Sequence, residues 1–129
     1  MLQSLAHIAL LVNDYDEAVT FYTQTLDFVL LEDKVMSPTK RWVMVAPQGS
    51  TGTTILLVKA SNEEQQSRIG NQTGGRVFLF LYTDDIKRDC QNFVDKKVTI
   101  IEELSSKPHG KVLVFADLYG NLWDLIQPV

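Results

Sequence analysis

One histidine and one aspartate stand in apolar stretches of the chain, where ionisable side chains are uncommon. His7 opens the first apolar run, and Asp124 lies between a tryptophan and a leucine near the other end. A carboxylate in a buried strand must be solvated by a cavity, paired with a cation, or protonated. His7 and Asp124 could form an acid–base pair. The alternatives are a neutral histidine with one hydrogen bond and a salt bridge from Asp124 to Arg41 or Arg76.

Two arginines stand beside apolar strands. Arg41 directly precedes Trp42, and Arg76 follows a pair of glycines. A guanidinium there could receive an anionic or carbonyl-bearing ligand. Arginines exposed at strand ends are the alternative.

Aromatic residues alternate along the run 77–83. Phe78, Phe80 and Tyr82 would share one face of a strand there. That face would give a cavity an aromatic wall, whereas ordinary core packing is the alternative.

The elements that must position these residues follow a pattern that occurs twice. In the first half, the apolar run 6–12 predicts a strand, and Asp14 with Glu17 predicts a capping box for a helix over 15–26. Three more strands are expected over 28–32, 41–46 and 53–58.

The pattern repeats after a polar segment, 61–75, which is expected to be a linker with a short helix. A strand over 77–83 and a helix over 86–96 precede strands over 98–102, 112–116 and 122–127. The chain therefore predicts an α+β fold of two tandem βαβββ modules, over about 4–60 and 76–128. One such module exposes a concave sheet face that it cannot cover alone, so we expect a curved mixed sheet around a cavity. A single α+β domain with accidental symmetry is the alternative.

Composition and charge narrow the class of protein. A chain of 129 residues suits one compact domain, and a net charge of −4 without a basic cluster argues against nucleic acid as a partner. The apolar runs are shorter than the roughly 20 residues of a membrane helix, so no membrane contact is expected. The lone Cys90 and the absence of a signal-like start favour a cytoplasmic location.

The two ends of the chain carry motifs of a known family. The stretch from His7 to Tyr22 (HIALLVNDYDEAVTFY) resembles the opening of vicinal oxygen chelate (VOC) proteins, the glyoxalase, bleomycin-resistance and dioxygenase superfamily. The stretch from Asp117 to Ile126 (DLYGNLWDLI) is similar to the closing Asp-Pro-x-Gly-Asn-x-x-Glu-Leu of that family. The resemblance implies one VOC domain over 1–129, a small-molecule ligand and a homodimer. It leaves the activity open, because the superfamily includes lyases, epimerases, dioxygenases, thiol transferases and non-catalytic drug binders.

The resemblance also implies where a metal would bind. In metal-dependent members, four inward-facing positions hold a divalent ion that chelates substrate oxygens. They match His7, Leu56 (or Leu57 with a register slip of one), Phe78 and Asp124. Because hydrocarbon side chains cannot coordinate a metal, His7 and Asp124 would leave most of the coordination shell to water. This argues against a conventional glyoxalase I and against the dioxygenase site, which needs a second histidine at Phe78.

Two functions stay open. One is a glyoxalase-like enzyme that acts on a small oxygenated molecule, a lyase or isomerase with His7 and Asp124 as partial metal ligands or as an acid–base pair. The other is a non-catalytic, drug-sequestering protein of the bleomycin-resistance kind. We favour a glyoxalase-like protein of undetermined activity, because binding and catalysis use the same cavity. The expected ligand contacts are Arg41, Trp42, Leu56, Arg76, Phe78 and Phe80.

Overall fold

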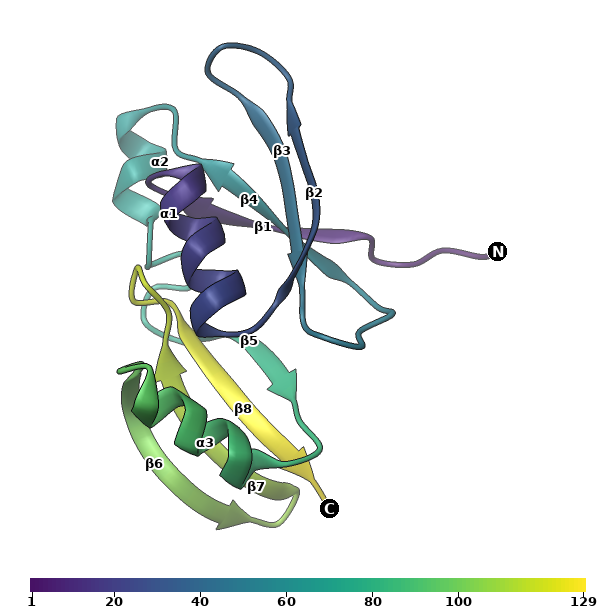
Figure 1. Cartoon of the computed structure of the whole chain (residues 1–129), viewed down its shortest axis with the longest axis vertical. Coiled ribbons are helices and arrows are strands. Elements are labelled where there is room, and N and C mark those ends of the chain that lie inside the picture. Colours follow the sequence, from purple (N-terminus) through teal and green to yellow (C-terminus); the bar gives the residue numbers. More distant parts are fainter. The chain divides into compact units, whose positions relative to one another are not determined.

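The computed structural model describes residues 1–129 and divides the chain into two units, Met1–Ile69 and Gly70–Val129. Each unit is an α+β structure with one four-stranded mixed sheet, coloured purple to teal and teal to yellow in Figure 1. The prediction of two tandem βαβββ modules is confirmed. No helix is both long enough and apolar enough to cross a membrane.

Unit 1 begins with a strand and a capped helix. The Asp14 side chain accepts a hydrogen bond from the backbone N–H of Glu17, which starts the helix as the capping pattern predicts. The sheet order is β1-β4-β3-β2, with β1 parallel to β4 and the other pairs antiparallel. The elements are β1 (His7–Val12), α1 (Tyr15–Thr20), the π-helical turn η1 (Phe21–Thr25), β2 (Val29–Val35), β3 (Arg41–Ala46), β4 (Thr54–Lys59) and α2 (Glu63–Arg68).

Unit 2 repeats this topology. Asp85 caps the helix through the N–H of Arg88. The sheet order is β5-β8-β7-β6, again with only the first pair parallel. The elements are β5 (Val77–Tyr82), α3 (Ile86–Asp95), β6 (Thr99–Lys107), β7 (Gly110–Ala116) and β8 (Leu122–Pro128).

Each sheet has one face packed on its own helix and one face that its helix does not cover. The helix-side core of unit 1 holds Leu10, Val12, Val43, Val45 and Leu57, which are at most 1% exposed. The core of unit 2 is aromatic, with ring centroids 4.6 Å apart for Phe93 and Phe115, and 5.8 Å apart for Phe115 and Trp123. Because side chains alternate along a strand, the other residues of the central strands lie on the second face, called the open face below.

The register of β5 contains an irregularity that matters for the site. Val77 pairs with Leu122 and Leu79 pairs with Trp123, so Phe78 is an extra residue in a β-bulge. Phe80 then pairs with Asp124. A regular alternation of Phe78, Phe80 and Tyr82 was expected, and the bulge removes Phe78 from it.

Several element boundaries also differ from those expected. The sixth strand continues to Lys107 and forms a tight hairpin with Gly110, although polar residues gave no strand signal there. Gly110 has φ +146° and lies so close to Gln127 that a Cβ would come within 2.3 Å of the carbonyl oxygen of Gln127. This close approach requires glycine. The short helix expected within 61–75, in contrast, is present as α2, capped by Asn62.

Candidate functional site

His7 lies on the open face of unit 1 in a defined hydrogen-bond arrangement. Its Nδ1 is 2.7 Å from Thr54 Oγ1, on the parallel neighbouring strand. The Thr54 hydroxyl also lies 3.3 Å from the carbonyl of Ala6. The bond to Thr54 fixes the orientation of the ring and leaves Nε2 without a partner in the chain.

Trp42 extends the same face beside His7. The two ring centroids are 5.9 Å apart with an interplanar angle of 80°, an edge-to-face contact. Leu56 lies two residues beyond Thr54 on β4, half-buried, and pairs with Met44. The structure therefore places His7 and Trp42 in contact, with Leu56 on the same face of the sheet, and all three were expected from the sequence.

Arg41 belongs to the opposite face of the same sheet. Its guanidinium donates to both carboxylate oxygens of Asp33, at 3.0 and 2.6 Å, and to Asp16 on the helix at 2.8 Å. It also lies 5.2 Å from the ring centre of Tyr15. The bonds to Asp33, and then those to Asp16, raise the pKa of Arg41 above its usual value. Arg41 fastens β2 and β3 to α1, and the structure does not bring it to the face of Trp42.

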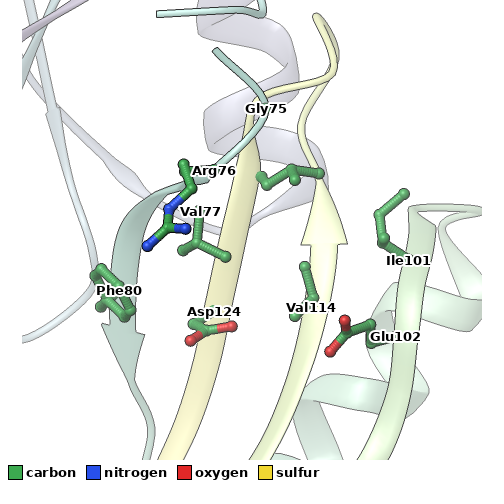
Figure 2. Close-up of a pocket in the computed structure, with 9 residues that line it drawn as sticks. Gly75, Arg76, Val77, Phe80, Ile101, Glu102, Val114 and Asp124 are labelled. Atoms are coloured by element: carbon green, nitrogen blue, oxygen red, sulfur yellow. The ribbon is translucent and has the colours of Figure 1, made fainter. Parts of the chain in front are cut away.

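Unit 2 contains a hollow of about 540 Å³ on the open face of its sheet. Its floor is formed by β5, β8, β7 and β6, and Figure 2 shows charged and aromatic side chains along its sides. Two of the expected ligand contacts, Arg76 and Phe80, line it together with Asp124. The lining residues are Gly75, Arg76, Val77, Phe80, Ile101, Glu102, Val114, Leu122 and Asp124.

Asp124 and Glu102 place two carboxylates in this hollow. Each pairs in register with Val114, one from either side, so the three residues form a row across β6, β7 and β8. Burial raises the pKa of Asp124, the negative charge of Glu102 raises it further, and His109 opposes the shift. Neither carboxylate forms an ion pair with a cation of the chain.

Phe80 is the single aromatic residue that lines the hollow, and it is 65% exposed. It lies directly beside Asp124, since the two residues pair across β5 and β8. Phe78, expected as a ligand contact, occupies the bulge and does not line the hollow. Val77 takes that place because the extra residue shifts the strand by one position.

A buried turn fixes the strand that carries Asp124. The Asp117 carboxylate accepts hydrogen bonds from the N–H groups of Tyr119 and Asn121 at 2.9 Å, and from the Asn121 side chain at 2.8 Å. Asp117 and Asn121 are 6% and 3% exposed. The Asp and Asn of the closing motif therefore hold the entry to β8, two residues before Asp124.

The residues at the four family ligand positions do not fit a metal ion held by four protein side chains. Leu56 pairs with Ala9 as Asp124 pairs with Phe80, so the register equivalent of His7 in unit 2 is Val77. Leu56 and Val77 offer no donor atom. Within either unit, no group of three or more His, Cys, Asp or Glu side chains could hold a metal ion. His7 belongs to unit 1 and Asp124 to unit 2, and an acid–base pair or shared metal site of the two stays a prediction.

The comparisons with known proteins identify the family. The model of the Glyoxalase/Bleomycin resistance protein/Dioxygenase superfamily matches residues 4–125. The chain belongs to this superfamily. The expected VOC membership is thereby confirmed, since the VOC family is this superfamily.

Relatives within the superfamily cover almost the whole chain. An uncharacterized protein of Shewanella frigidimarina is 52% identical over 98% of this chain and 95% of its own. TnmS3, an antibiotic binding protein from Streptomyces sp. CB03234, is similar with 29% identity, a TM-score of 0.80 and coverage of 99% and 98%. A glyoxalase/bleomycin resistance protein from the same Streptomyces strain is 30% identical, with a TM-score of 0.75 and coverage of 96% and 100%.

Sequence reasoning missed Glu102 as a member of the hollow. The sequence did contain a signal: aligning the two halves at a shift of 70 residues places Glu32 on Glu102. The structure agrees with this alignment, because the two glutamates pair with the equivalent residues Met44 and Val114. Val77 was missed because nothing in the composition marks the bulge at Phe78.

Proposed function

We propose that this superfamily member is a non-catalytic small-molecule binding protein whose ligand contains a flat ring system. The observation that carries the proposal is the hollow of unit 2, which has the volume of a small-molecule site. An exposed phenylalanine forms one wall, and Val77, Val114 and Leu122 supply an apolar floor. A large apolar ring held out of the core is typical of a surface that a ligand covers.

Similarity to an antibiotic-binding protein supports the same proposal. TnmS3 is similar over nearly its whole length and is described as an antibiotic binding protein. The hydrocarbon side chains Leu56 and Val77 at two metal-ligand positions also favour binding over metal-assisted chemistry.

The test uses a neutral flat-ring probe, anthracenemethanol, and follows its fluorescence and the thermal midpoint of the protein. Binding to the folded state raises the midpoint with probe concentration. Phe80→Ala should weaken binding about tenfold, which corresponds to ~1.4 kcal/mol. Tyr82→Ala is the matched control, because Tyr82 is 73% exposed on the same strand, close to the 65% of Phe80, but does not line the hollow. If both variants bind like wild type, the ligand does not lie in the hollow.

The second candidate is a metal-assisted glyoxalase-like lyase or isomerase. It is favoured by one observation, the 2.7 Å hydrogen bond between His7 Nδ1 and Thr54 Oγ1, which orients the ring and leaves Nε2 available to a metal ion. Ni²⁺, Zn²⁺, Mn²⁺ and Fe²⁺ added in turn should then raise the thermal midpoint of wild type and not of His7→Ala. Thr54→Val should reduce the effect. If no ion raises the midpoint, this candidate fails.

A homodimer and a cytoplasmic location complete the proposal. The exposed edge strand β2 carries Val29, Leu30, Leu31 and Val35, each at least 40% exposed, which is an apolar surface suited to a second copy. Light scattering coupled to gel filtration should give twice the mass of one chain. Mass equal to one chain at micromolar concentration would contradict the dimer.

A further inference from the structure

The hollow of unit 2 contains more negative than positive charge. Arg76 contributes one positive charge, and Glu102 and Asp124 contribute two negative charges when all three are ionised. Arg76 enters the hollow at the Gly75 end (Figure 2) and makes no ion pair with either carboxylate. The hollow therefore has a net charge of −1 when these three groups are ionised.

The two carboxylates are placed to share one positive group. Neighbouring strands lie about 4.8 Å apart, so Glu102 and Asp124 start from backbone positions separated by roughly 10 Å across β7. Figure 2 shows their side chains on either side of Val114, whose short side chain leaves space above it. A single ammonium group between them could donate hydrogen bonds to both carboxylates, since it has three N–H donors.

Holding these two groups together costs free energy in the ligand-free protein. The pKa of Asp124 is raised, first by loss of water and then by the charge of Glu102. A cation between them would remove the repulsion and replace interactions that water no longer provides. Binding of a cation would therefore offset this unfavourable free energy.

Phe80 adds a second kind of contact next to the same point. It pairs with Asp124 and is 65% exposed. A ring system that covers Phe80 brings any substituent on its edge toward the two carboxylates. The ring face also attracts a nearby cation.

We propose that the hollow selects ligands that combine a flat ring system with a protonated amine, the amine held between Glu102 and Asp124 and the ring lying against Phe80. The inference rests on the proposed function and specifies its ligand class. A divalent metal ion fits this place less well than an ammonium group does. Two carboxylates alone leave most of its coordination shell to water.

The experiment compares two probes of nearly equal shape, anthracenemethylamine, which is protonated at neutral pH, and anthracenemethanol, which is neutral. The quantity measured is the ratio of their Kd values, by fluorescence titration at low salt. Wild type should bind the amine at least tenfold more tightly than the alcohol. In Glu102→Gln combined with Asp124→Asn the ratio should fall to about one. Should this double variant fail to fold, Glu102→Gln alone must lower the ratio.

Glu103→Gln is the matched control. It removes one negative charge from the adjacent position of the same strand, but Glu103 does not line the hollow. The control should keep the wild-type ratio, which separates a local site from attraction by the net charge of −4. If the alcohol binds and the amine has no advantage, the inference fails and the proposed function stands. If neither probe binds, both fail.

Discussion

The open faces of the two sheets differ although the sheets have the same strand order. In unit 1 this face carries His7, Thr54 and Trp42, which are joined by a hydrogen bond and an edge-to-face ring contact. In unit 2 the equivalent region carries Asp124 and Glu102 beside an exposed Phe80. The framework of the repeat is kept in the caps, strand order and helix-side core, whereas the polar and aromatic differences are concentrated on the faces that the helices do not cover. Side chains on these faces can therefore change without disturbing the fold.

The turns that lead into the last strand of each unit also differ, in how they are hydrogen-bonded. In unit 2 this turn is closed by the buried Asp117 and Asn121, with three hydrogen bonds on the aspartate. In unit 1 the corresponding loop 47–53 is largely exposed, and its side chains bond outside the loop: Gln48 donates to the carbonyl of Asp27 at 2.9 Å and Thr53 to that of Leu5 at 2.8 Å. The turn before β8 is therefore closed by a buried carboxylate, whereas the loop before β4 depends on exposed hydrogen bonds between uncharged groups.

The largest expected effect tests this difference between the turns. Asp117→Ala should lower the free energy of unfolding by about 2–4 kcal/mol, because it leaves buried N–H groups without their charged acceptor. Urea denaturation measures the loss. Thr53→Val, which removes the hydroxyl that donates to Leu5 in the matching loop of unit 1, should lower it by about 1 kcal/mol or less. Equal effects of the two substitutions would show that the turns do not differ in this way.

A smaller effect is expected from the ion pairs on the helix side. Arg41→Ala should cost about 1 kcal/mol, because its side chain is only 24% exposed and binds Asp33 through two nitrogens. Arg88→Ala should cost less, since Arg88 is 51% exposed and its partners are on its own helix or just before it. The comparison is made by urea denaturation in low and high salt. If Arg88→Ala lowered the free energy of unfolding more than Arg41→Ala does, the structural role given to Arg41 would be wrong.

The smallest effect concerns the charge on the open face of unit 2. The raised pKa of Asp124 means that its ionised form is less favourable in the folded state than in the unfolded state. The resulting instability is present above the folded pKa and disappears as the pH falls below the unfolded value of about 4. Asp124→Asn should therefore raise the thermal midpoint at pH 7, by less than about 3 °C because the group is partly solvated, and should have no effect near pH 3.

Asp84→Asn should change the thermal midpoint at pH 7 in the opposite direction. Its hydrogen bond with Arg88 lowers the pKa of Asp84, so the ionised form stabilises the folded state at pH 7. Replacing Asp84 should slightly lower the midpoint at pH 7, and the difference should also vanish as the pH falls. A lower midpoint for Asp124→Asn at pH 7 would mean that its charge is compensated in the folded protein.

The sequence predicts the framework well because the framework follows local rules. The caps at Asp14 and Asp85 and the strand Arg41–Ala46 lie where turn chemistry and apolar periodicity place them. Strict alternation along that strand would also have assigned Arg41 to the face of Val43 and Val45, and thus away from Trp42. The face of the sheet on which a residue lies can be derived from its odd or even position along the strand, provided that the strand has no bulge.

The rest depends on contacts that no local pattern encodes. The polar end of β6 is a strand because β7 pairs with it through a tight hairpin, and its residues show no strand-like alternation. The hollow depends on Glu102 meeting Asp124 across β7, a relation set by the register of three strands. A bulge changes such relations without any mark in the composition, as at Phe78.

The extra residue in β5 decides which side chain stands opposite Leu122. With the bulge, Val77 pairs with Leu122 and lines the hollow, and deleting Phe78 would leave that pair in place. Closing the bulge with Phe78 retained would instead pair Phe78 with Leu122 and turn Val77 to the other face. Strand register, as well as residue identity, thus determines the surface that this face presents.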